Sequence, residues 1–359
     1  MDEQTEDKSH VTTLTMRVDA RGQKAAVIGA GAWGTAMANL LAAKGMPVKM
    51  WAYEREVVEA IRKKRENTLF LPGVNLHENI TPTGSLPDAM RQCTLIVFAV
   101  PSHAARTVLS QLTPLLSSPV AFISATKGIE EDTLMLMSDV MKELLLPMMH
   151  RAVIVLSGPS FAQEVSRGLP TAVALAGDDP LLLKRVQGLL MTPSFRIYTS
   201  NDLIGVQLGG ALKNVIAIAA GVVDGLKLGH DARAALITRG LAEMVRLGTA
   251  MKADPQTFYG LSGLGDLILT CTGALSRNYT VGVRLGKGDT LEEVFKDTRT
   301  VAEGVRTARA ARDLAKKHQV NMPIVEEVCQ VLFEGKLSRQ SVVELMERAA
   351  RDETDQPAP

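Results

Sequence analysis

The feature that most constrains the fold is an alternation, through the first half of the chain, of short β-rich runs with segments of helical spacing. Short, nearly continuous apolar runs are typical of strands that are buried on both faces of a parallel sheet. The pattern therefore predicts an α/β sheet. Its first five strands are expected at residues 24–28, 47–51, 94–98, 120–124 and 152–156.

The pattern changes near residue 200. Further β-rich runs at 172–175 and 195–198 would complete the sheet, whereas the later stretches 232–251 and 301–318 have helical spacing. A chain of 359 residues is long enough for two domains. We therefore predict a sheet domain followed by an all-helical domain and short disordered ends. The expected ranges are 23–200 for the sheet domain, 201–350 for the helical domain, and 1–22 and 351–359 for the ends.

Composition excludes several classes of protein. Lysine and arginine together number 40, and aspartate and glutamate 39, so no strong net field attracts nucleic acid or an anionic membrane. The three cysteines, Cys93, Cys271 and Cys329, show no paired spacing and no clustered histidines, which argues against a disulfide framework or a metal site. The polar amino-terminal residues lack the features of a secretory signal. We expect a cytoplasmic protein with a small-molecule partner.

A glycine motif follows the first expected strand. Gly29, Gly31 and Gly34 have the spacing of a dinucleotide-binding turn, with a strand before them and a helical segment after them. In such a turn the first glycine allows the tight bend, the second lets the backbone approach a pyrophosphate, and the third lets the helix pack on the strand. The helix start then offers unpaired N–H groups to the anion.

The choice between NAD and NADP stays open at this stage. Glu54 lies about 20 residues after the motif, where an acidic side chain binds a ribose hydroxyl and favours NAD. Tyr53 and Arg55 flank it, and an arginine there can accept the 2′-phosphate of NADP.

The segment 203–223 is almost uniformly apolar, yet Lys213 and Asn214 lie in its middle. Lysine at the centre of a membrane span costs roughly 2.5 to 3.5 kcal/mol, which favours a buried helix of a soluble protein. An ammonium there must face a partner charge or a cavity, and burial would lower its pKa towards the range of proton transfer. We expect Gly209 and Gly210 to leave room for a ligand. The alternative is a lysine that extends to solvent.

Other stretches have residues suited to binding or catalysis. Ser276, Arg277 and Asn278 precede a helical run, so a serine cap, a guanidinium and free N–H groups would suit a phosphate monoester. An ordinary helix cap with a solvated arginine is the alternative. Lys127 and the stretch from Ser157 to Ser160 follow expected strands at the carboxyl edge, where open α/β sheets bind ligands.

Two more residues at turns are candidates for acid–base chemistry. His103 follows the expected strand 94–98 and could exchange a proton. Asp266 could pair with a lysine and fix its charge state. Both residue types are also common in turns with no role in chemistry.

Taken in chain order, these motifs resemble those of bacterial-type NAD(P)-dependent glycerol-3-phosphate dehydrogenases. The resemblance runs from about residue 24 to about residue 351. The acidic amino-terminal extension has no counterpart in it. The motifs are GAGAWGTA, FLPGV, VPSH, ATKG, SGPSFAQEV, GVQLGGALKNVIAIAAG, ITRGLAEM, GLGDLILTCT, SRN and VAEG.

The resemblance implies a fold, a reaction and an assembly. The fold is a Rossmann-type doubly wound sheet domain followed by an all-α C-terminal domain, and the assembly is a homodimer. The reaction interconverts sn-glycerol 3-phosphate and dihydroxyacetone phosphate with NAD(P)H or NAD(P)+ as cofactor, and supplies glycerophospholipid synthesis. A related 3-hydroxy-acid dehydrogenase and a noncatalytic dinucleotide sensor are the alternatives.

The resemblance also implies roles for individual residues. Lys213 is similar to the family's proton acceptor, with Lys127 and Asp266 beside it, whereas His103 matches no catalytic position. The substrate positions are Lys127, Gly158, Ser160, Lys213, Asp266, Ser276, Arg277 and Asn278. The dinucleotide positions are Gly29, Gly31, Ala32, Trp33, Gly34, Tyr53, Lys127, Ala162, Arg277, Val301 and Glu303.

Overall fold

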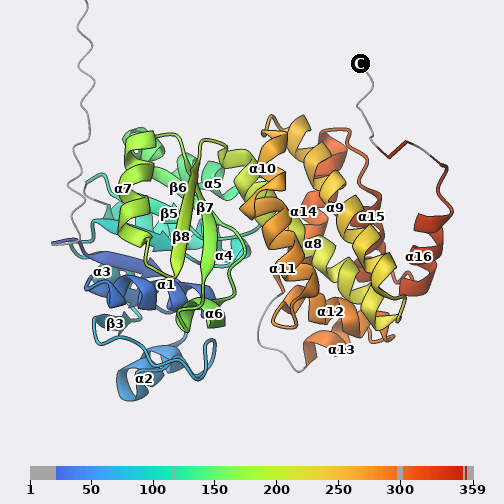
Figure 1. Ribbon diagram of the computed structural model, residues 1–359. Helices are drawn as coiled ribbons and strands as arrows, with labels where there is room; N and C mark the ends of the chain where they lie inside the picture. The colour runs from blue at the N-terminus through green and yellow to red at the C-terminus, as the bar shows by residue number, and fades with distance from the viewer. Residues whose placement is uncertain (1–21, 117, 297–301, 351, 354–359) are drawn as a thin grey trace, which may run out of the picture.

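The computed structural model describes residues 22–116, 118–296, 302–350 and 352–353, and it places a sheet part beside a helical part (Figure 1). The sheet has eight strands in the order β3-β2-β1-β4-β5-β6-β7-β8. Seven of the eight lie where the sequence predicts them. The strands are β1 Ala25–Ile28, β2 Val48–Trp51, β3 Ile80–Thr83, β4 Leu95–Phe98, β5 Ala121–Ser124, β6 Val153–Ser157, β7 Thr171–Gly177 and β8 Phe195–Ser200.

The strands β1 to β6 are parallel, and their register places Ala25 beside Val48 on one side and Leu95 on the other. β7 runs antiparallel to β6, with Ser157 opposite Ala174, and β8 is parallel to β7. A parallel return from β6 would need a crossover of a dozen or more residues. The connection from β6 to β7 contains only the one short helix α6 (Ala162–Ser166), so the direction reverses there.

Helices cover both faces of the sheet, which confirms the predicted doubly wound, Rossmann-type architecture. Side chains of α1, α2 and α7 enter the core on one face, and those of α3, α4 and α5 enter the core on the other. The bounds are α1 Ala32–Ala43, α2 Arg55–Lys64, α3 Leu86–Met90, α4 Ser102–Leu112, α5 Met137–Leu144 and α7 Pro180–Leu190, with short 3₁₀ turns at Thr113–Leu115 and Pro147–Ala152.

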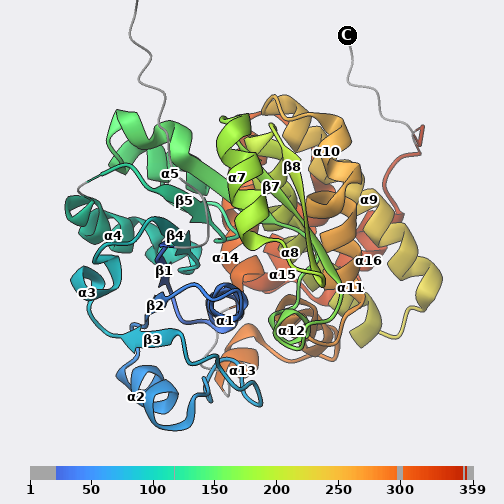
Figure 2. The same cartoon turned by 60° about the vertical axis from the view of Figure 1, so that its left-hand side comes forward.

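The helical part begins with α8 (Leu203–Gly225), which packs against β6 and β7 and against most of the later helices. Figure 2 shows this junction from another side. Among the described residues α8 alone is long and apolar enough to cross a membrane, and its apolar stretch is completely buried within the structure. The other helices are α9 His230–Ala250, α10 Pro255–Tyr259, α11 Asp266–Thr272, α12 Arg277–Gly286, α13 Leu291–Lys296, α14 Glu303–Lys317, α15 Pro323–Phe333 and α16 Ser338–Met346.

The backbones of α8 and α12 are in direct contact. A Cβ atom at Gly282 would lie 1.9 Å from the carbonyl oxygen of Ile218, and one at Gly221 would lie 2.1 Å from that of Tyr279. Glycine is therefore required on both helices for this close crossing, as in other helix pairs joined through small residues.

The predicted domain boundary at residue 200 remains a proposal. β8 ends at Ser200 and α8 begins at Leu203, so the last strand and the first long buried helix meet at that point. The predicted disordered ends, 1–22 and 351–359, fall outside the described residues except for Gly22, Asp352 and Glu353.

Candidate active site

The glycine loop that follows β1 has the geometry of a phosphate-binding turn. Gly29 has φ +108°, and a Cβ there would lie 2.7 Å from the carbonyl oxygen of Ala99, at the end of β4. A Cβ at Gly34 would lie 1.9 Å from the carbonyl oxygen of Gly29, which closes the turn onto the helix. A Cβ at Gly31, by contrast, would meet nothing within 4 Å. The open side of the loop is the side where a ligand can approach the backbone.

The start of α1 fits a dinucleotide pyrophosphate. Gly31 precedes the helix and supplies no side-chain cap, so the first N–H groups, from Ala32 onward, face the open side of the loop. The buried indole Nε1–H of Trp33 finds no acceptor among the residues that the structure describes. A buried donor without a partner is rare, and it indicates a place where a bound ligand completes the hydrogen bonding.

We expect Gly34→Ala to weaken NADH binding roughly 5- to 150-fold, since forcing a methyl group into a filled space costs roughly 1–3 kcal/mol. The methyl group would collide with the backbone of Gly29 and push the loop out of position. Fluorescence titration with NADH measures the effect. Gly188→Ala is the matched control, because a Cβ on this α7 glycine meets nothing within 4 Å. Equal affinities in the two variants would contradict the role given to the loop.

Two lysines share one buried carboxylate at the carboxyl edge of the sheet. The Nζ of Lys213 on α8 donates to Oδ1 of Asp266, and also to Oγ1 of Thr270 at 2.8 Å. The Nζ of Lys127, which follows β5, donates to Oδ2 of Asp266 at 2.6 Å and to the carbonyl oxygen of Gly158 at 3.2 Å. Lys213 is 7% exposed and Asp266 1%. The structure thus brings together all three residues that the resemblance assigns to catalysis.

Burial sets the protonation of this cluster. It lowers the pKa of Lys213 to about 8, because the ammonium form loses its hydration. The negative charge of Asp266 opposes that shift, and the neighbouring charge of Lys127 adds to it. A lysine with a pKa near the operating pH can accept and return a proton.

The segment before Asp266 shapes this site and corrects one expectation. Residues Leu261–Gly265 form a wide helical turn of the π type that runs directly into α11. A Cβ at Gly209 would lie 2.5 Å from the carbonyl oxygen of Ser262, and one at Gly210 would lie 2.4 Å from Oγ of Ser157. The expectation that these two glycines leave room for a ligand is wrong: the space is filled by the protein, which lets Asp266 approach α8.

Side-chain hydrogen bonds connect the start of α12 to α8, next to Lys213, and to the start of α14. Ser276 is buried and caps the helix, with its Oγ accepting from the N–H of Tyr279 at 3.2 Å. Asn278 Nδ2 donates to Oδ1 of Asn214 at 2.9 Å, and its Oδ1 accepts from the N–H of Gly304 at 3.0 Å. Asn214 is therefore held by α12 rather than by its neighbour Lys213. Arg277 extends from the helix start and is exposed.

The remaining predicted binding residues lie at the ends of strands or the starts of helices. Ser160 Oγ donates to the carbonyl oxygen of Gly158 at 2.9 Å, and Ala162 begins α6. Tyr53 follows β2 and is 84% exposed. Glu303 begins α14, and its Oε2 accepts from Ser102 Oγ at 2.7 Å. Val301 lies outside the described residues.

The sequence analysis did not name Thr270 or Ser102 as site residues, and it considered His103, which lies away from the lysine cluster. Thr270 is one turn after Asp266 on α11, a spacing that could have indicated it. Ser102 lies within the VPSH stretch of the resemblance, but nothing in that stretch assigned it a role. Charges of Arg306 and Glu131, rather than the lysine cluster, act on His103, whose pKa is lowered mainly by burial.

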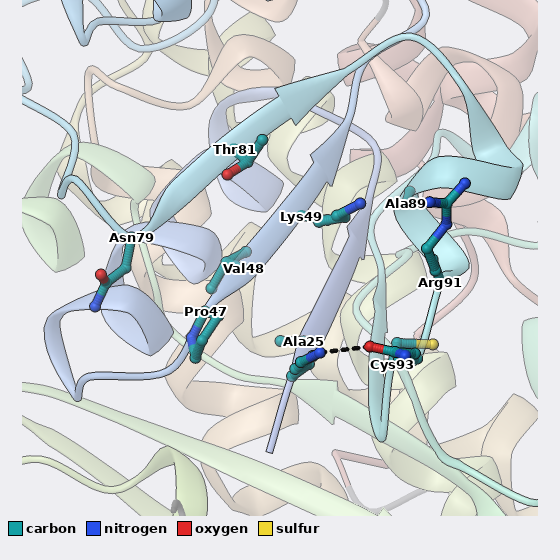
Figure 3. A pocket seen from close by; sticks show the side chains of 11 residues that line it. Ala25, Pro47, Val48, Lys49, Asn79, Thr81, Ala89, Arg91 and Cys93 are labelled. Atoms are coloured by element: carbon teal, nitrogen blue, oxygen red, sulfur yellow. Dashed lines mark hydrogen bonds between the residues drawn. The ribbon is translucent and has the colours of Figure 1, made fainter. Parts of the chain in front are cut away.

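A separate pocket lies at the opposite edge of the sheet, beside the amino ends of β1 to β4 (Figure 3). Ala25, Val48 and Ala89 form part of its wall, and Lys49 and Arg91 extend along it. Because the glycine loop and the lysine cluster follow the carboxyl ends of the strands, this pocket is not part of their site.

Comparison with known proteins decides the family. Residues 24–182 match the model of the NAD-dependent glycerol-3-phosphate dehydrogenase N-terminus, and residues 202–343 match the model of the C-terminus of the same family. The chain belongs to the NAD-dependent glycerol-3-phosphate dehydrogenase family. It is thus an oxidoreductase that uses a nicotinamide dinucleotide, as the resemblance of its motifs implies.

Individual relatives agree with this membership. The chain is 56% identical over 331 residues to a glycerol-3-phosphate dehydrogenase [NAD(P)+] of Geobacter sulfurreducens, covering 92% of this chain and 99% of the relative. A relative with the same description from Geobacter metallireducens is 55% identical over 332 residues, with the same coverage. The crystal structure of a glycerol-3-phosphate dehydrogenase from Coxiella burnetii superposes with a TM-score of 0.87 at 39% identity, covering 91% of this chain and 99% of that one.

Proposed function

We propose that this chain interconverts sn-glycerol 3-phosphate and dihydroxyacetone phosphate, with Lys213 as the group that moves the hydroxyl proton. The observation that supports this assignment is the buried Nζ of Lys213, held between Asp266 and Thr270 with a pKa lowered to about 8. The glycine loop lies along the same carboxyl edge, since Gly29 packs against the residues that follow β4 and Lys127 follows the neighbouring β5.

In this proposal each residue around the buried lysine has a defined role in the reaction. In the oxidising direction the neutral amine of Lys213 takes the proton from the C2 hydroxyl, and in the reducing direction the ammonium returns it. Asp266 holds both lysines in place, and Thr270 fixes the direction of the Lys213 amine. A bound nicotinamide supplies the acceptor or donor of the hydride at C2.

The substrate phosphate is assigned to the start of α12. The guanidinium of Arg277 and the first N–H groups of the helix offer charge-assisted hydrogen bonds to a phosphate monoester. Binding energy gained on the phosphate, away from the reacting carbon, serves to orient that carbon beside Lys213.

The rate of glycerol 3-phosphate oxidation should rise as the pH is raised through about 8, and the rate of the reverse reduction should fall over the same range. Because burial lowers the pKa of Lys213, the neutral amine needed for proton abstraction accumulates above that pH, and the ammonium needed for reduction accumulates below it. Measuring kcat against pH in both directions tests this. An inflection near 10.5, the ordinary value for lysine, would contradict it.

The decisive assay follows nicotinamide absorbance with dihydroxyacetone phosphate, once with NADH and once with NADPH. Turnover with either cofactor supports the proposal. A 3-hydroxy-acid dehydrogenase would instead turn over the keto acid, and a noncatalytic sensor would bind NADH without turnover of either substrate. The assay also decides the cofactor preference, which Glu54 and Arg55 leave open. Both residues lie at the start of α2, where Glu54 makes no side-chain cap and Arg55 pairs with Glu59 at 3.0 Å.

The setting of the enzyme is proposed on the same basis. We infer a cytoplasmic enzyme without a membrane span that assembles as a homodimer and whose product supplies glycerophospholipid synthesis. The burial of α8 supports the absence of a span, because this helix is fully enclosed by protein. Analytical ultracentrifugation tests the dimer, since a monomer at micromolar concentration would contradict it.

A further inference from the structure

A buried serine of the sheet part donates a hydrogen bond to the helical part beside the proposed dinucleotide site. Ser102, the first residue of α4, donates from Oγ to Oε2 of Glu303, the first residue of α14, at 2.7 Å. The two residues are 201 positions apart in the chain. Ser102 is only 3% exposed, so its hydroxyl is enclosed by protein and directed at this one acceptor.

The turn after β5 packs onto the same pair. Gly128 has φ +154°, and a Cβ there would lie 2.7 Å from both Cβ and Oγ of Ser102 and 3.5 Å from Oε2 of Glu303. Gly128 directly follows Lys127, which holds Asp266. The Ser102 hydroxyl therefore lies where the turn after β4, the turn after β5 and the start of α14 meet.

The Glu303 carboxylate that accepts this bond lies in an environment that disfavours its charged form. Burial raises the pKa of Glu303, while the hydrogen bonds from Ser102 and the charges of Arg277 and Arg306 lower it. These groups come from α4, α12 and α14. A largely buried carboxylate needs its donors to stay ionised and in one orientation.

We propose that Ser102 is a positioning residue for the dinucleotide: its hydroxyl holds the Glu303 carboxylate in the orientation that receives the cofactor. This inference rests on the proposed function and on the dinucleotide position that the resemblance of the motifs implies for Glu303. It extends that function to a residue on the opposite side of the junction, which touches neither the substrate nor the reacting carbon.

The test is the affinity for NADH, measured by fluorescence titration without substrate. Ser102→Ala should raise the Kd for NADH roughly tenfold, the lower end of the effect of losing a hydrogen bond to a charged group. The kcat and the KM for dihydroxyacetone phosphate should stay within about twofold of the parent values, because Lys213 and Arg277 are untouched. The affinity of Ser102→Ala should also fall further as the pH is lowered, since Glu303 then protonates more readily.

Two further variants separate positioning from general damage. Ser110→Ala is the matched control, because Ser110 lies on the same helix, is exposed, and donates to the carbonyl oxygen of Thr107 at 2.9 Å. Glu303→Gln should weaken NADH binding by itself, and adding Ser102→Ala to it should have little further effect. If Ser102→Ala does not fold, Glu303→Gln with unchanged NADH affinity overturns the inference.

The outcomes distinguish this inference from the proposed function. Unchanged NADH affinity in Ser102→Ala, or full additivity with Glu303→Gln, would overturn the positioning role while the parent enzyme still binds and turns over. Failure of the parent chain to bind NADH would instead overturn the proposed function. An equal rise in the KM for dihydroxyacetone phosphate would show a structural role alone, and would also overturn the inference.

Discussion

Replacing Lys213 by alanine is expected to lower kcat by roughly 10²- to 10⁴-fold, the usual contribution of a positioned acid or base. The Nζ of Lys213 is buried beside Asp266 and Thr270, and no second amine occupies that side of the carboxylate among the described residues. Dinucleotide affinity should stay nearly intact, because the glycine loop lies between β1 and α1, whereas Lys213 lies on α8. Steady-state kinetics and NADH titration on the same preparation measure both quantities.

Two controls sharpen this experiment. Lys184→Ala removes an exposed lysine from α7 and should leave kcat unchanged. Lys213→Arg keeps the positive charge beside Asp266 but cannot lose a proton, so it should also be slow in oxidation. Near-normal turnover in Lys213→Ala would remove this residue from the mechanism, and near-normal oxidation by Lys213→Arg would reduce its role to that of a fixed charge.

The second large effect is expected at the phosphate. Arg277→Ala should raise the KM for dihydroxyacetone phosphate roughly 10- to 100-fold, since a hydrogen bond to a charged group contributes about 1.5–3 kcal/mol. Arg277 is exposed at the start of α12, whose cap is supplied by Ser276 rather than by the arginine. The helix should therefore survive the substitution, and circular dichroism would show that it does.

Comparison of two substrates isolates the phosphate contact. Dihydroxyacetone lacks the phosphate, so its already low kcat/KM should change little in Arg277→Ala, whereas kcat/KM for dihydroxyacetone phosphate should fall. An equal loss with both substrates would assign Arg277 to general structure or to the dinucleotide. An unchanged KM for the phosphorylated substrate would defeat the assignment.

Much of the sheet was predictable because its strands are buried on both faces and are therefore uniformly apolar. The strand β3 was missed because its sequence, Ile80-Thr-Pro-Thr83, is short and contains Pro82. Proline lacks a backbone donor and is tolerated here because β3 lies at the edge of the sheet. The antiparallel direction of β7 could not be predicted from the apolar pattern either, because antiparallel and parallel buried strands have the same apolar composition.

The site was predictable only where local sequence determines its geometry. The glycine loop depends on neighbouring residues, and its spacing alone indicated its shape. The partner of Lys213 lies 53 positions away on another helix. The buried lysine by itself indicated only that a counter-charge exists, and it was the resemblance of the motifs that placed Asp266 beside it. Gly209 and Gly210 were misjudged for the same reason: missing side chains look alike in sequence whether a ligand or protein backbone fills the space.

The contact between the backbones of α8 and α12 fixes the distance between Lys213 and the start of α12. Lys213 lies on α8 and the proposed phosphate-binding residues lie at the start of α12, and the glycine contacts at 221 and 282 leave no room for the two helices to slide past each other. The hydrogen bond between Asn214 and Asn278, at 2.9 Å, ties the same two points together. If the substrate binds as proposed, this fixed spacing should favour substrates whose phosphate lies at one particular distance from the reacting carbon.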